Sequence, residues 1–329
     1  MKYIKEDKNF IFDVEKKICF KEKIKRFLSF CLSVIYKMKS NIFYPHKKNE
    51  KKYNVSICAI FKNESQYLKE WIEYHKIIGV NHFYLYNNNS TDNFKKVLDT
   101  YIEEGLVDLI DWPKNQAQME CYHNCITRFK DESQWIGFID IDEFINLIKY
   151  DNIYDFLKKF QKNRGSVLIY WKIFGSSGLI DRNRKNLVCE DFTSCWPKHD
   201  SIGKCFYNTN YDFNVNDKRN KILHHILWTS YKGMRFPPVN SFNKICINNI
   251  HKAKKTFDIQ INHYFTKSYQ EYLDKKSKGD VYFKINPHDE EYFFEHESKC
   301  TSADTSIYRF LIKLKKEYYK EDLKNGEWK

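Results

Sequence analysis

The first half of the chain alternates between short apolar runs and segments whose apolar residues recur at helical spacing. A short apolar run bounded by polar residues is typical of a buried strand, whereas apolar residues at i, i+3, i+4 and i+7 indicate an amphipathic helix. The runs at residues 54–61, 82–86, 106–110 and 135–139 predict four strands. Helices are predicted between them from three apolar sets: Leu68, Trp71, Ile72 and His75; Phe94, Val97 and Leu98; Met119, Tyr122, Ile126 and Phe129. This alternation indicates an α/β fold, with a mostly parallel sheet flanked by helices.

The second half of the chain is less regular. Further strands are predicted at residues 166–171 and 259–265, and a helix at 155–160. An amphipathic helix is predicted over residues 304–319, where one face is apolar: Ile307, Phe310, Leu311, Leu314 and Tyr318. The resulting division of the chain is an N-terminal basic and apolar extension (1–50), a main domain (51–290) and a C-terminal amphipathic helix (within 291–329).

Acidic residues follow the fourth predicted strand, in the order Asp140-Ile141-Asp142-Glu143. A buried unpaired carboxylate is costly, but the carboxyl end of a parallel strand is where α/β proteins bind ligands. If the chain stays extended there, Asp140 and Asp142 share a face and can both bind one hard cation, Mg²⁺ or Mn²⁺, which in turn holds a diphosphate. The alternative is an exposed acidic turn. Because each of the four strands ends in polar residues, we predict a nucleotide-binding crevice, although no G-x-G-x-x-G or Walker A motif is present.

Composition narrows the class of protein. Lys and Arg number 56 against 43 Asp and Glu, and the net charge of +13 suits an anionic ligand, a membrane surface or nucleic acid. The ten cysteines form no C-x-x-C pair, which indicates reduced thiols and a cytoplasmic protein. The apolar run at residues 27–36 would be about 15 Å long as a helix, too short to span a bilayer. It could lie at a membrane interface, peripherally at the inner face of the plasma membrane, or pack on the main domain.

Five spaced blocks resemble glycosyltransferase family 92 and the related family-2-like bacterial transferases. They are Phe61-Lys62-Asn63-Glu64 with Tyr67-Leu68-x-Glu70-Trp71, Tyr86-Asn87-x-x-Ser90-x-Asp92, the D-x-D-E-F run from Asp140 to Phe144, Trp171-x-x-Phe174-Gly175-x-x-Gly178, and Asn262-His263-Tyr264-x-x-Lys267-Ser268. The resemblance covers about residues 54–280. The usual Arg-Gly after the last block reads Lys278-Gly279 here.

This resemblance implies an α/β fold of GT-A type, Rossmann-like, with peripheral N- and C-terminal helical elements. It also implies an inverting reaction that depends on Mn²⁺ or Mg²⁺ and uses a nucleoside diphosphate-sugar donor. The family's nucleotide-binding role falls on four residues: Lys62, Asn63, Glu64 and Asp92. Its metal-binding role falls on Asp140 and Asp142.

Other residues extend this chemistry. His263, at a polar strand end, is a candidate third metal ligand or diphosphate contact, and Lys267 is a candidate phosphate-binding residue. The alternatives are a hydrogen-bonded structural histidine and a solvated lysine. Inversion by single displacement needs a general base that takes the proton of the acceptor hydroxyl. Glu190 and Asp191 are the candidates for this base, with Glu143 behind them.

Three other functions fit part of the pattern. A phosphatase of the haloacid dehalogenase type also ends a strand in D-x-D, but it needs Thr or Val where this chain has Phe144. A nucleotidyltransferase with a GT-A-like fold usually carries a glycine-rich loop after its first strand, and residues 61–65 contain no glycine. A non-enzymatic basic module that binds membrane or nucleic acid would leave the five ordered blocks unexplained.

We therefore expect a membrane-associated cytoplasmic glycosyltransferase. Its donor would be a nucleoside diphosphate-sugar, with a UDP-sugar favoured. Its acceptor would be a glycan or glycolipid of the cell surface, such as lipopolysaccharide or capsule, and we expect no binding of nucleic acid.

Overall fold

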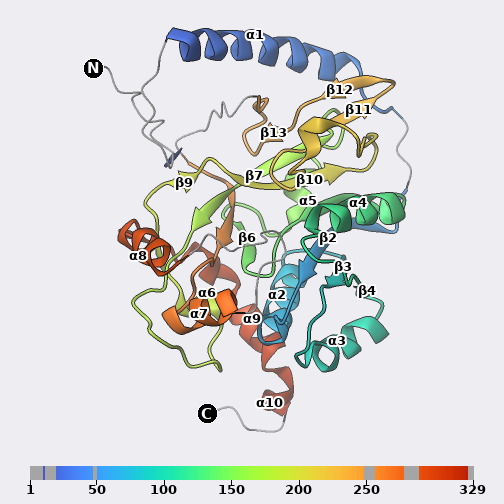
Figure 1. The fold of residues 1–329 in the computed structure, drawn as a ribbon. Coiled ribbons are helices and arrows are strands. Elements are labelled where there is room, and N and C mark those ends of the chain that lie inside the picture. Colours follow the sequence, from blue (N-terminus) through green and yellow to red (C-terminus); the bar gives the residue numbers. More distant parts are fainter. Residues whose placement is uncertain (1–9, 12–19, 47–49, 248–255, 278–288, 325–329) are drawn as a thin grey trace.

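A computed structural model describes residues 10–11, 20–46, 50–247, 256–277 and 289–324 of the chain. Within these ranges a nine-stranded sheet forms the centre of the molecule (Figure 1). Its strands lie in the order β4 (Val107–Asp111), β3 (His82–Asn87), β2 (Tyr53–Phe61), β5 (Ser133–Phe138), β10 (Gly203–Asn208), β7 (Ser166–Ile173), β14 (Ile259–His263) and β6 (Glu143–Leu147), and β13 (Val239–Asn240) also pairs with β7.

The sheet is mostly parallel. The strands β2, β3, β4 and β5 pair in parallel, as do β7 and β14. The exceptions on this path are β10, which is antiparallel to both neighbours, and β6, which is antiparallel to β14. The α/β fold predicted from the sequence is therefore confirmed. Strand β10 was not predicted, because residues 203–208 lie in the irregular region of the sequence.

Helices cover both faces of the sheet, and each face has its own apolar cluster. Side chains of a strand point to alternate faces, so Ile57 belongs to one cluster and its neighbour Cys58 to the other. The first cluster includes side chains from α2 (Ser65–Ile77), α3 (Phe94–Glu103), α5 (Ile153–Leu157) and α9 (Leu311–Tyr318). The second includes side chains from α4 (Gln118–Phe129). Burial on both faces explains why the central strands read as continuous apolar runs.

Shorter elements complete the described structure: β1 (Phe10–Ile11), α6 (Val188–Asp191), β8 (Ser194–Cys195), β9 (His199–Asp200), η1 (Lys218–Asn220), β11 (Thr229–Tyr231), β12 (Met234–Phe236), α7 (Tyr269–Ser277), α8 (Glu290–Ser298), β15 (Ser302–Ala303), η2 (Ser306–Phe310) and α10 (Lys320–Lys324). The amphipathic helix predicted over residues 304–319 corresponds to η2 followed by α9. Strand β15 pairs with β8 just before it, and Oδ1 of Asp304 accepts the N–H of Ser306 at the start of η2. Ile307, Phe310 and Leu314 are buried in the first apolar cluster.

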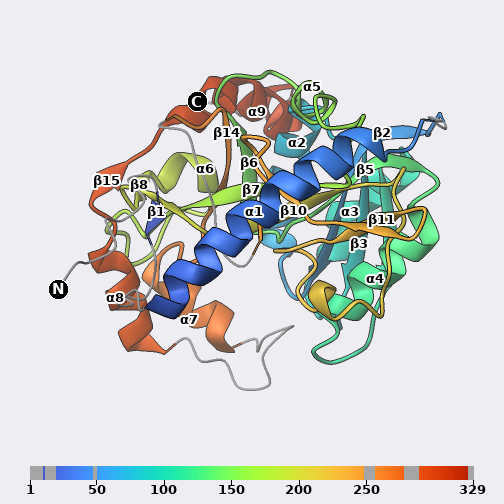
Figure 2. The ribbon, with the colours of Figure 1, turned by 90° about the horizontal axis from the view of Figure 1, so that it is seen from above.

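Helix α1 (Phe20–Ile42) lies across the molecule, apart from the helices that flank the sheet (Figures 1 and 2). It is longer than the apolar run at residues 27–36 suggested. Among the described residues, no helix has both the length and the apolar character needed to cross a membrane.

Candidate active site

The turn between β5 and β6 carries the acidic residues of the predicted metal site. The extended chain on which a shared face of Asp140 and Asp142 depended is not formed, because residues 141–142 make a turn before β6 begins at Glu143. The indole Nε1 of Trp71 donates to the carbonyl oxygens of Asp140 (3.1 Å) and Glu143 (2.9 Å). The N–H of Tyr264 donates to the carbonyl oxygen of Asp142 (2.9 Å). Helix α2 and the end of β14 therefore hold this turn from two sides.

Asp142, Glu143 and His263 bring potential metal ligands together, with one ligand atom of each lying within 4.8 Å of the others. Nε2 of His263 lies 3.7 Å from Oδ1 of Asp142 and 4.0 Å from Oε1 of Glu143. Glu143 is fully buried, and its Oε1 has no hydrogen-bond partner in the described part of the chain. An orphaned buried carboxylate oxygen next to a second carboxylate and an imidazole fits Mn²⁺ or Mg²⁺. Two of the predicted ligands thus lie together, and Glu143 joins them.

Asp140, the third predicted ligand, lies beside this group but is held by other side chains. Its Oδ1 accepts from Nε2 of Gln118 (3.1 Å) and from the hydroxyl of Tyr122 (3.2 Å). Its Oδ2 accepts from Nζ of Lys204 at 2.7 Å. The same Nζ lies 3.5 Å from Oε1 of Glu143, so Lys204 links Asp140 to the three clustered ligands.

Two lysines that the sequence analysis did not identify pair with the two aspartates. Lys204 comes from β10, and Lys275 from α7 donates to Oδ2 of Asp142 at 2.5 Å. The side chain of Lys204 is only 1% exposed. A lysine inside an otherwise apolar segment could have signalled a charge partner, because buried lysines are almost always paired. Lys275 resembles any lysine near a helix end and gave no such signal.

Burial and charge act in opposite directions on these groups. Burial tends to raise the pKa of Asp142, but the charges of Lys275, His263 and Lys267 outweigh it and hold that pKa below its usual value. Burial raises the pKa of Glu143 well above its usual value despite the charge of Lys204. Burial also lowers the pKa of His263 to about 4, so its imidazole is neutral at pH 7 and able to bind a metal.

The loops after β2 and β3 are tied together by residues of the predicted nucleotide site. Asn63 donates its N–H to the hydroxyl of Ser90 (3.0 Å), and its Oδ1 accepts the N–H of Thr91 (2.7 Å). Oδ2 of Asp92 accepts the N–H of Ser65 at the start of α2 (2.8 Å). Oδ1 of Asp92 is buried and has no hydrogen-bond partner among the residues described. This oxygen is available to accept an N–H from a ligand.

The remaining predicted nucleotide contacts lie around the same rim. Lys62 and Glu64 follow β2 and are half-buried. Lys267 is 4% exposed, and its Nζ lies 4.2 Å from the centre of the Tyr67 ring. Burial lowers the pKa of Lys267, while the charges of Glu64 and Asp142 oppose that shift. Lys267 is therefore not the solvated lysine of the alternative interpretation, and it lies in the electrostatic field of Asp142.

The two predicted bases lie in α6 and take part in other contacts. Nζ of Lys315 lies 2.5 Å from Oε1 of Glu190. Nη1 of Arg182 lies 3.5 Å from Oδ2 of Asp191, whose Oδ1 accepts from Nδ2 of Asn186 (2.9 Å). These partners come from α9 and the loop before α6, not from the acidic turn. The role of Glu190 or Asp191 as general base stays a prediction.

Aromatic rings border the clustered ligands. The centre of the Trp171 ring lies 4.6 Å from that of His263 and 5.0 Å from that of His225. Nδ1 of His225 bonds to the carbonyl oxygen of Gly203 (2.6 Å), next to Lys204. Trp171 is half-buried. Such a ring can pack against the apolar face of a sugar.

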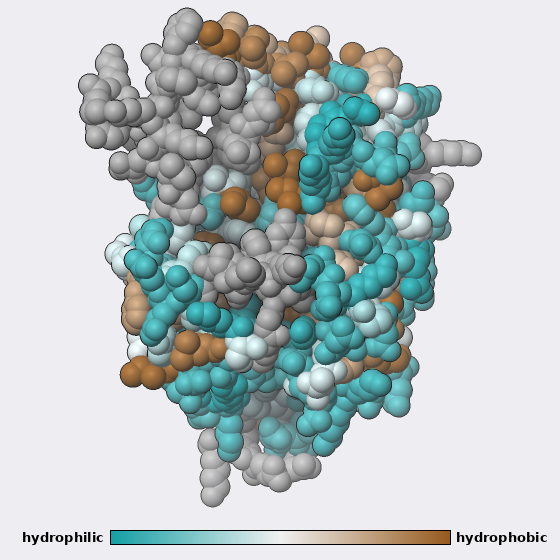
Figure 3. Space-filling model, in the orientation of Figure 1, coloured by the Kyte–Doolittle hydropathy of each residue, from teal (hydrophilic) through white to brown (hydrophobic). Residues whose placement is uncertain are grey.

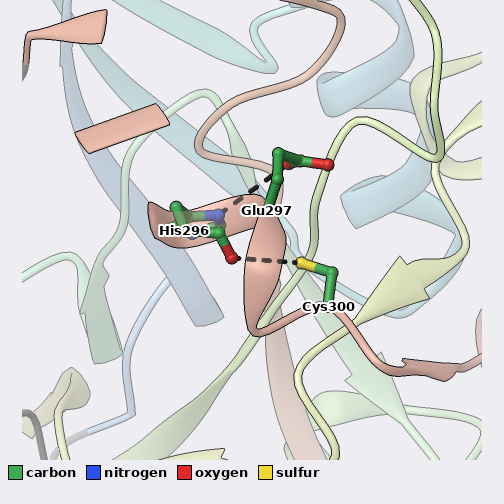
Figure 4. Close-up of side chains that lie close together, drawn as sticks. All are labelled: His296, Glu297 and Cys300. Atoms are coloured by element: carbon green, nitrogen blue, oxygen red, sulfur yellow. Dashed lines mark hydrogen bonds and ion pairs between the residues drawn. The ribbon is translucent and has the colours of Figure 1, made fainter. Parts of the chain in front are cut away.

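A second group of possible ligands, His296, Glu297 and Cys300, lies at the end of α8 (Figure 4). Both oxygens of Glu297 already accept hydrogen bonds from Ser176, at 2.8 Å from its N–H and 2.7 Å from its hydroxyl. Burial, with a further contribution from Glu297, raises the pKa of the Cys300 thiol to about 12. These contacts support a structural role, in which Glu297 holds the turn after β7 against α8.

Comparison with known proteins identifies one family. The model of glycosyltransferase family 92 matches residues 51–307. A family 92 protein of Ricinus communis is 34% identical over 140 residues, which cover 41% of this chain and 25% of that protein. A galactan β-1,4-galactosyltransferase of Arabidopsis thaliana is 32% identical over 117 residues, which cover 32% of this chain and 23% of that protein. The chain thus spans about a quarter of the length of the curated relatives it matches.

Similar solved structures are more distant. Residues 1–349 of S. aureus TarS, in complex with UDP-GlcNAc, have a TM-score of 0.33 and 10% identity over 62% of this chain and 61% of that one. Glucosyl-3-phosphoglycerate synthase of Mycobacterium tuberculosis, in complex with Mn²⁺, UDP and glucosyl-3-phosphoglycerate, has a TM-score of 0.27 and 14% identity over 36% of this chain and 44% of that one.

Proposed function

This chain belongs to glycosyltransferase family 92, and from that premise we propose that it transfers a sugar from a nucleoside diphosphate donor to an acceptor hydroxyl, with inversion and with a divalent cation. The resemblance found in the sequence is confirmed by the family match, and the mostly parallel α/β sheet agrees with the GT-A type of fold. Membership in this family also disfavours the nucleotidyltransferase and the non-enzymatic binding module as alternatives.

The observation that carries the proposal is the convergence of Asp142 and Glu143, from the turn between β5 and β6, with His263 at the end of β14. Mn²⁺ or Mg²⁺ would be held by these side chains, with Asp140 beside them, and when bound it supplies positive charge that stabilises the departing diphosphate. Lys267 and Lys275 would add positive charge on the same side of the site. Trp71 and Tyr264 position the turn and contribute no charge.

The donor's nucleoside would lie over the loops after β2 and β3. Oδ1 of Asp92, which has no hydrogen-bond partner within the described ranges, could accept the N–H of a nucleobase, and uracil offers such a group at its N3. Lys62, Asn63 and Glu64 would line the nucleoside and diphosphate, as the family resemblance implies. A UDP-sugar is therefore the first donor to test, and the galactosyltransferase names of two relatives make a hexose the first sugar.

The acceptor would enter beside Trp171, whose ring borders the clustered ligands. We propose a glycan or a glycolipid of the cell surface as the acceptor. A general base must take the proton of the attacking hydroxyl, and Glu190 and Asp191 are the residues to replace first. Near-normal kcat in both Glu190→Gln and Asp191→Asn would remove them from this role.

A thermal-shift experiment tests the donor site directly. We expect UDP to raise the melting temperature of the protein in the presence of Mn²⁺, and EDTA to abolish this rise, because a ligand that binds only the folded state stabilises it by mass action. Asp142→Asn should lose the rise while it keeps a cooperative unfolding transition. Asp155→Asn is the matched control, since Asp155 is exposed on α5 and should leave the rise unchanged.

Transfer is then measured as release of UDP from UDP-hexose donors with candidate acceptors. Retention of the Mn²⁺-dependent rise in Asp142→Asn would contradict the metal site. A rise with UDP that is the same with and without EDTA would contradict metal dependence but leave the nucleotide site in place.

A further inference from the structure

Helix α1 exposes its apolar side chains to solvent. Phe27, Met38 and Ile42 are each more than 60% exposed. The exposed apolar residues of the helix also include Ile24, Leu28, Phe30, Leu32, Val34 and Ile35. In the space-filling view, hydrophobic residues gather along the top of the molecule, where Figure 1 places α1 (Figure 3). Contiguous exposed apolar surface of this kind marks an interaction site.

Polar side chains attach α1 to the body of the protein. Among the residues of α1 whose burial is described, Ser29 and Ser40 are buried, at 3% and 4% exposed. Nη1 of Arg164 donates to Oγ of Ser40 at 2.8 Å, and Nδ2 of Asn163 donates to Oδ1 of Asn41 at 2.8 Å. A surface helix of a globular protein normally buries its apolar stripe and exposes its polar one. In α1 this arrangement is reversed, so a hydrophobic environment is needed on the outside of the helix.

Aromatic packing adds to this inner attachment. The ring of Tyr36 meets the ring of Trp228 edge-on, with centres 5.7 Å apart. Nζ of Lys39 lies 5.4 Å from the centre of the Phe236 ring in β12. The apolar outer face of α1 is thus held in a defined orientation on the body of the protein.

The charge of α1 identifies the partner. The helix contains one acidic residue, Glu22, and six basic residues: Lys21, Lys23, Lys25, Arg26, Lys37 and Lys39. The whole chain carries a net charge of +13. The helix lacks the apolar character needed to cross a bilayer. Helices that lie in the plane of a membrane interface combine an apolar stripe with basic residues, as α1 does. A second copy of the chain would instead bring two strongly basic helices together.

We propose that α1 binds a bilayer with anionic lipid headgroups, lying flat with its apolar face among the acyl chains. With 23 residues, the helix offers a contact about 34 Å long. Phe27, Ile35 and Met38 would enter the apolar region, and Lys37 would remain at the level of the headgroups. This attachment does not depend on the proposed sugar transfer.

Sedimentation with lipid vesicles tests this proposal on the full chain. We expect the protein to bind vesicles of phosphatidylcholine mixed with phosphatidylglycerol more strongly than vesicles of phosphatidylcholine alone, and added salt should weaken the binding. The triple variant Phe27→Ser, Ile35→Ser and Met38→Ser should partition into anionic vesicles about 100-fold less than the wild type. Because these side chains are exposed, its melting temperature should be unchanged.

The matched control is the double variant Ile180→Ser and Ile312→Ser. These isoleucines are 75% and 71% exposed but lie outside α1, so their replacement should leave vesicle binding as in the wild type. Equal binding of the triple variant and the wild type would overturn the proposal, as would failure of the wild type to bind anionic vesicles. Sedimentation equilibrium without lipid completes the test. A stable dimer that the triple variant abolishes, without vesicle binding by the wild type, would assign the face to a second copy.

Discussion

Glu70 links helix α2 to α6, the helix that carries both predicted bases. Its Oε2 accepts the N–H of Val188 at 2.7 Å, and its Oε1 accepts the N–H of Cys189 at 3.1 Å. These donors belong to the first turn of α6, which no preceding turn can satisfy. Glu70 is 3% exposed, and Val188 and Cys189 are each 1% exposed, so water cannot take the place of the carboxylate. We predict that Glu70→Ala destabilises the protein by leaving two buried N–H groups without an acceptor.

The size of the effect follows from these contacts. A buried donor left without a partner costs about 1–3 kcal/mol. Glu70→Ala leaves two such donors, but it also removes the cost of burying a carboxylate. The expected net loss in the free energy of unfolding is about 2–5 kcal/mol. Glu70→Gln keeps the shape and one acceptor oxygen, but its amide group faces the other N–H. We therefore expect it to lose about 1–3 kcal/mol, less than the alanine variant.

Urea unfolding followed by circular dichroism measures the free energy of unfolding of the three proteins. The control is Glu103→Ala, an exposed glutamate on α3, which should stay within about 0.5 kcal/mol of the wild type. A Glu70→Ala variant as stable as this control would refute the argument, because it would mean that the two N–H groups of α6 find other acceptors at little cost.

Two further changes test the packing of the sheet and of α2. Burial lowers the pKa of His75 in the folded protein to about 3, whereas in the unfolded chain its imidazole is protonated below about pH 6.5. The contribution of neutral His75 to stability is therefore full above pH 6.5 and is lost as the pH falls toward 3. At pH 5 this effect should lower the free energy of unfolding of the wild type by about 2 kcal/mol. In His75→Gln, the free energy of unfolding measured in urea should depend less steeply on pH than in the wild type. In Gly203→Ala the new Cβ would lie 2.0 Å from the carbonyl oxygen of Ile169, and we expect a loss of about 3 kcal/mol or more in thermal unfolding. Gly105→Ala, with a φ of +69° but open space, should lose only about 1 kcal/mol, and similar values for both glycines would contradict the predicted clash.

The strands and helices of the first half could be predicted because local pattern and burial agree there. The predicted strands at residues 54–61 and 82–86 correspond to β2 and β3, which are buried on both faces. The orientation of α1 could not be predicted in the same way. An apolar stripe shows which side of a helix seeks a hydrophobic environment, but the identity of that environment depends on the tertiary contacts of the other side. In α1 those contacts include the hydrogen bonds of Ser40 and Asn41 and the packing of Tyr36 on Trp228.

The acidic turn shows why a site is only partly visible in sequence. Asp140, Asp142 and Glu143 are adjacent, so their shared location was predicted, and the position of His263 at a strand end suggested a ligand. The counter-charges come from distant parts of the chain, since Lys204 is 64 residues from Asp140 and Lys275 is 133 residues from Asp142. The apolar surroundings of Lys204 indicate that it has a charge partner, but the sequence near either lysine does not identify which carboxylate it pairs with.

These lysines explain how three carboxylates can share one turn in the folded protein. Like charges a few ångströms apart repel strongly where water is excluded, so the turn needs nearby positive charge before any ligand arrives. Lys275 supplies it through Oδ2 of Asp142, which leaves Oδ1 facing His263. Lys204 supplies positive charge through its ion pair with Oδ2 of Asp140. Its Nζ lies 3.5 Å from Oε1 of Glu143, which is too far for a full hydrogen bond to that oxygen. The lysines thus stabilise the acidic turn while the oxygens that face His263 stay available, so a divalent cation could bind there without displacing either ammonium group.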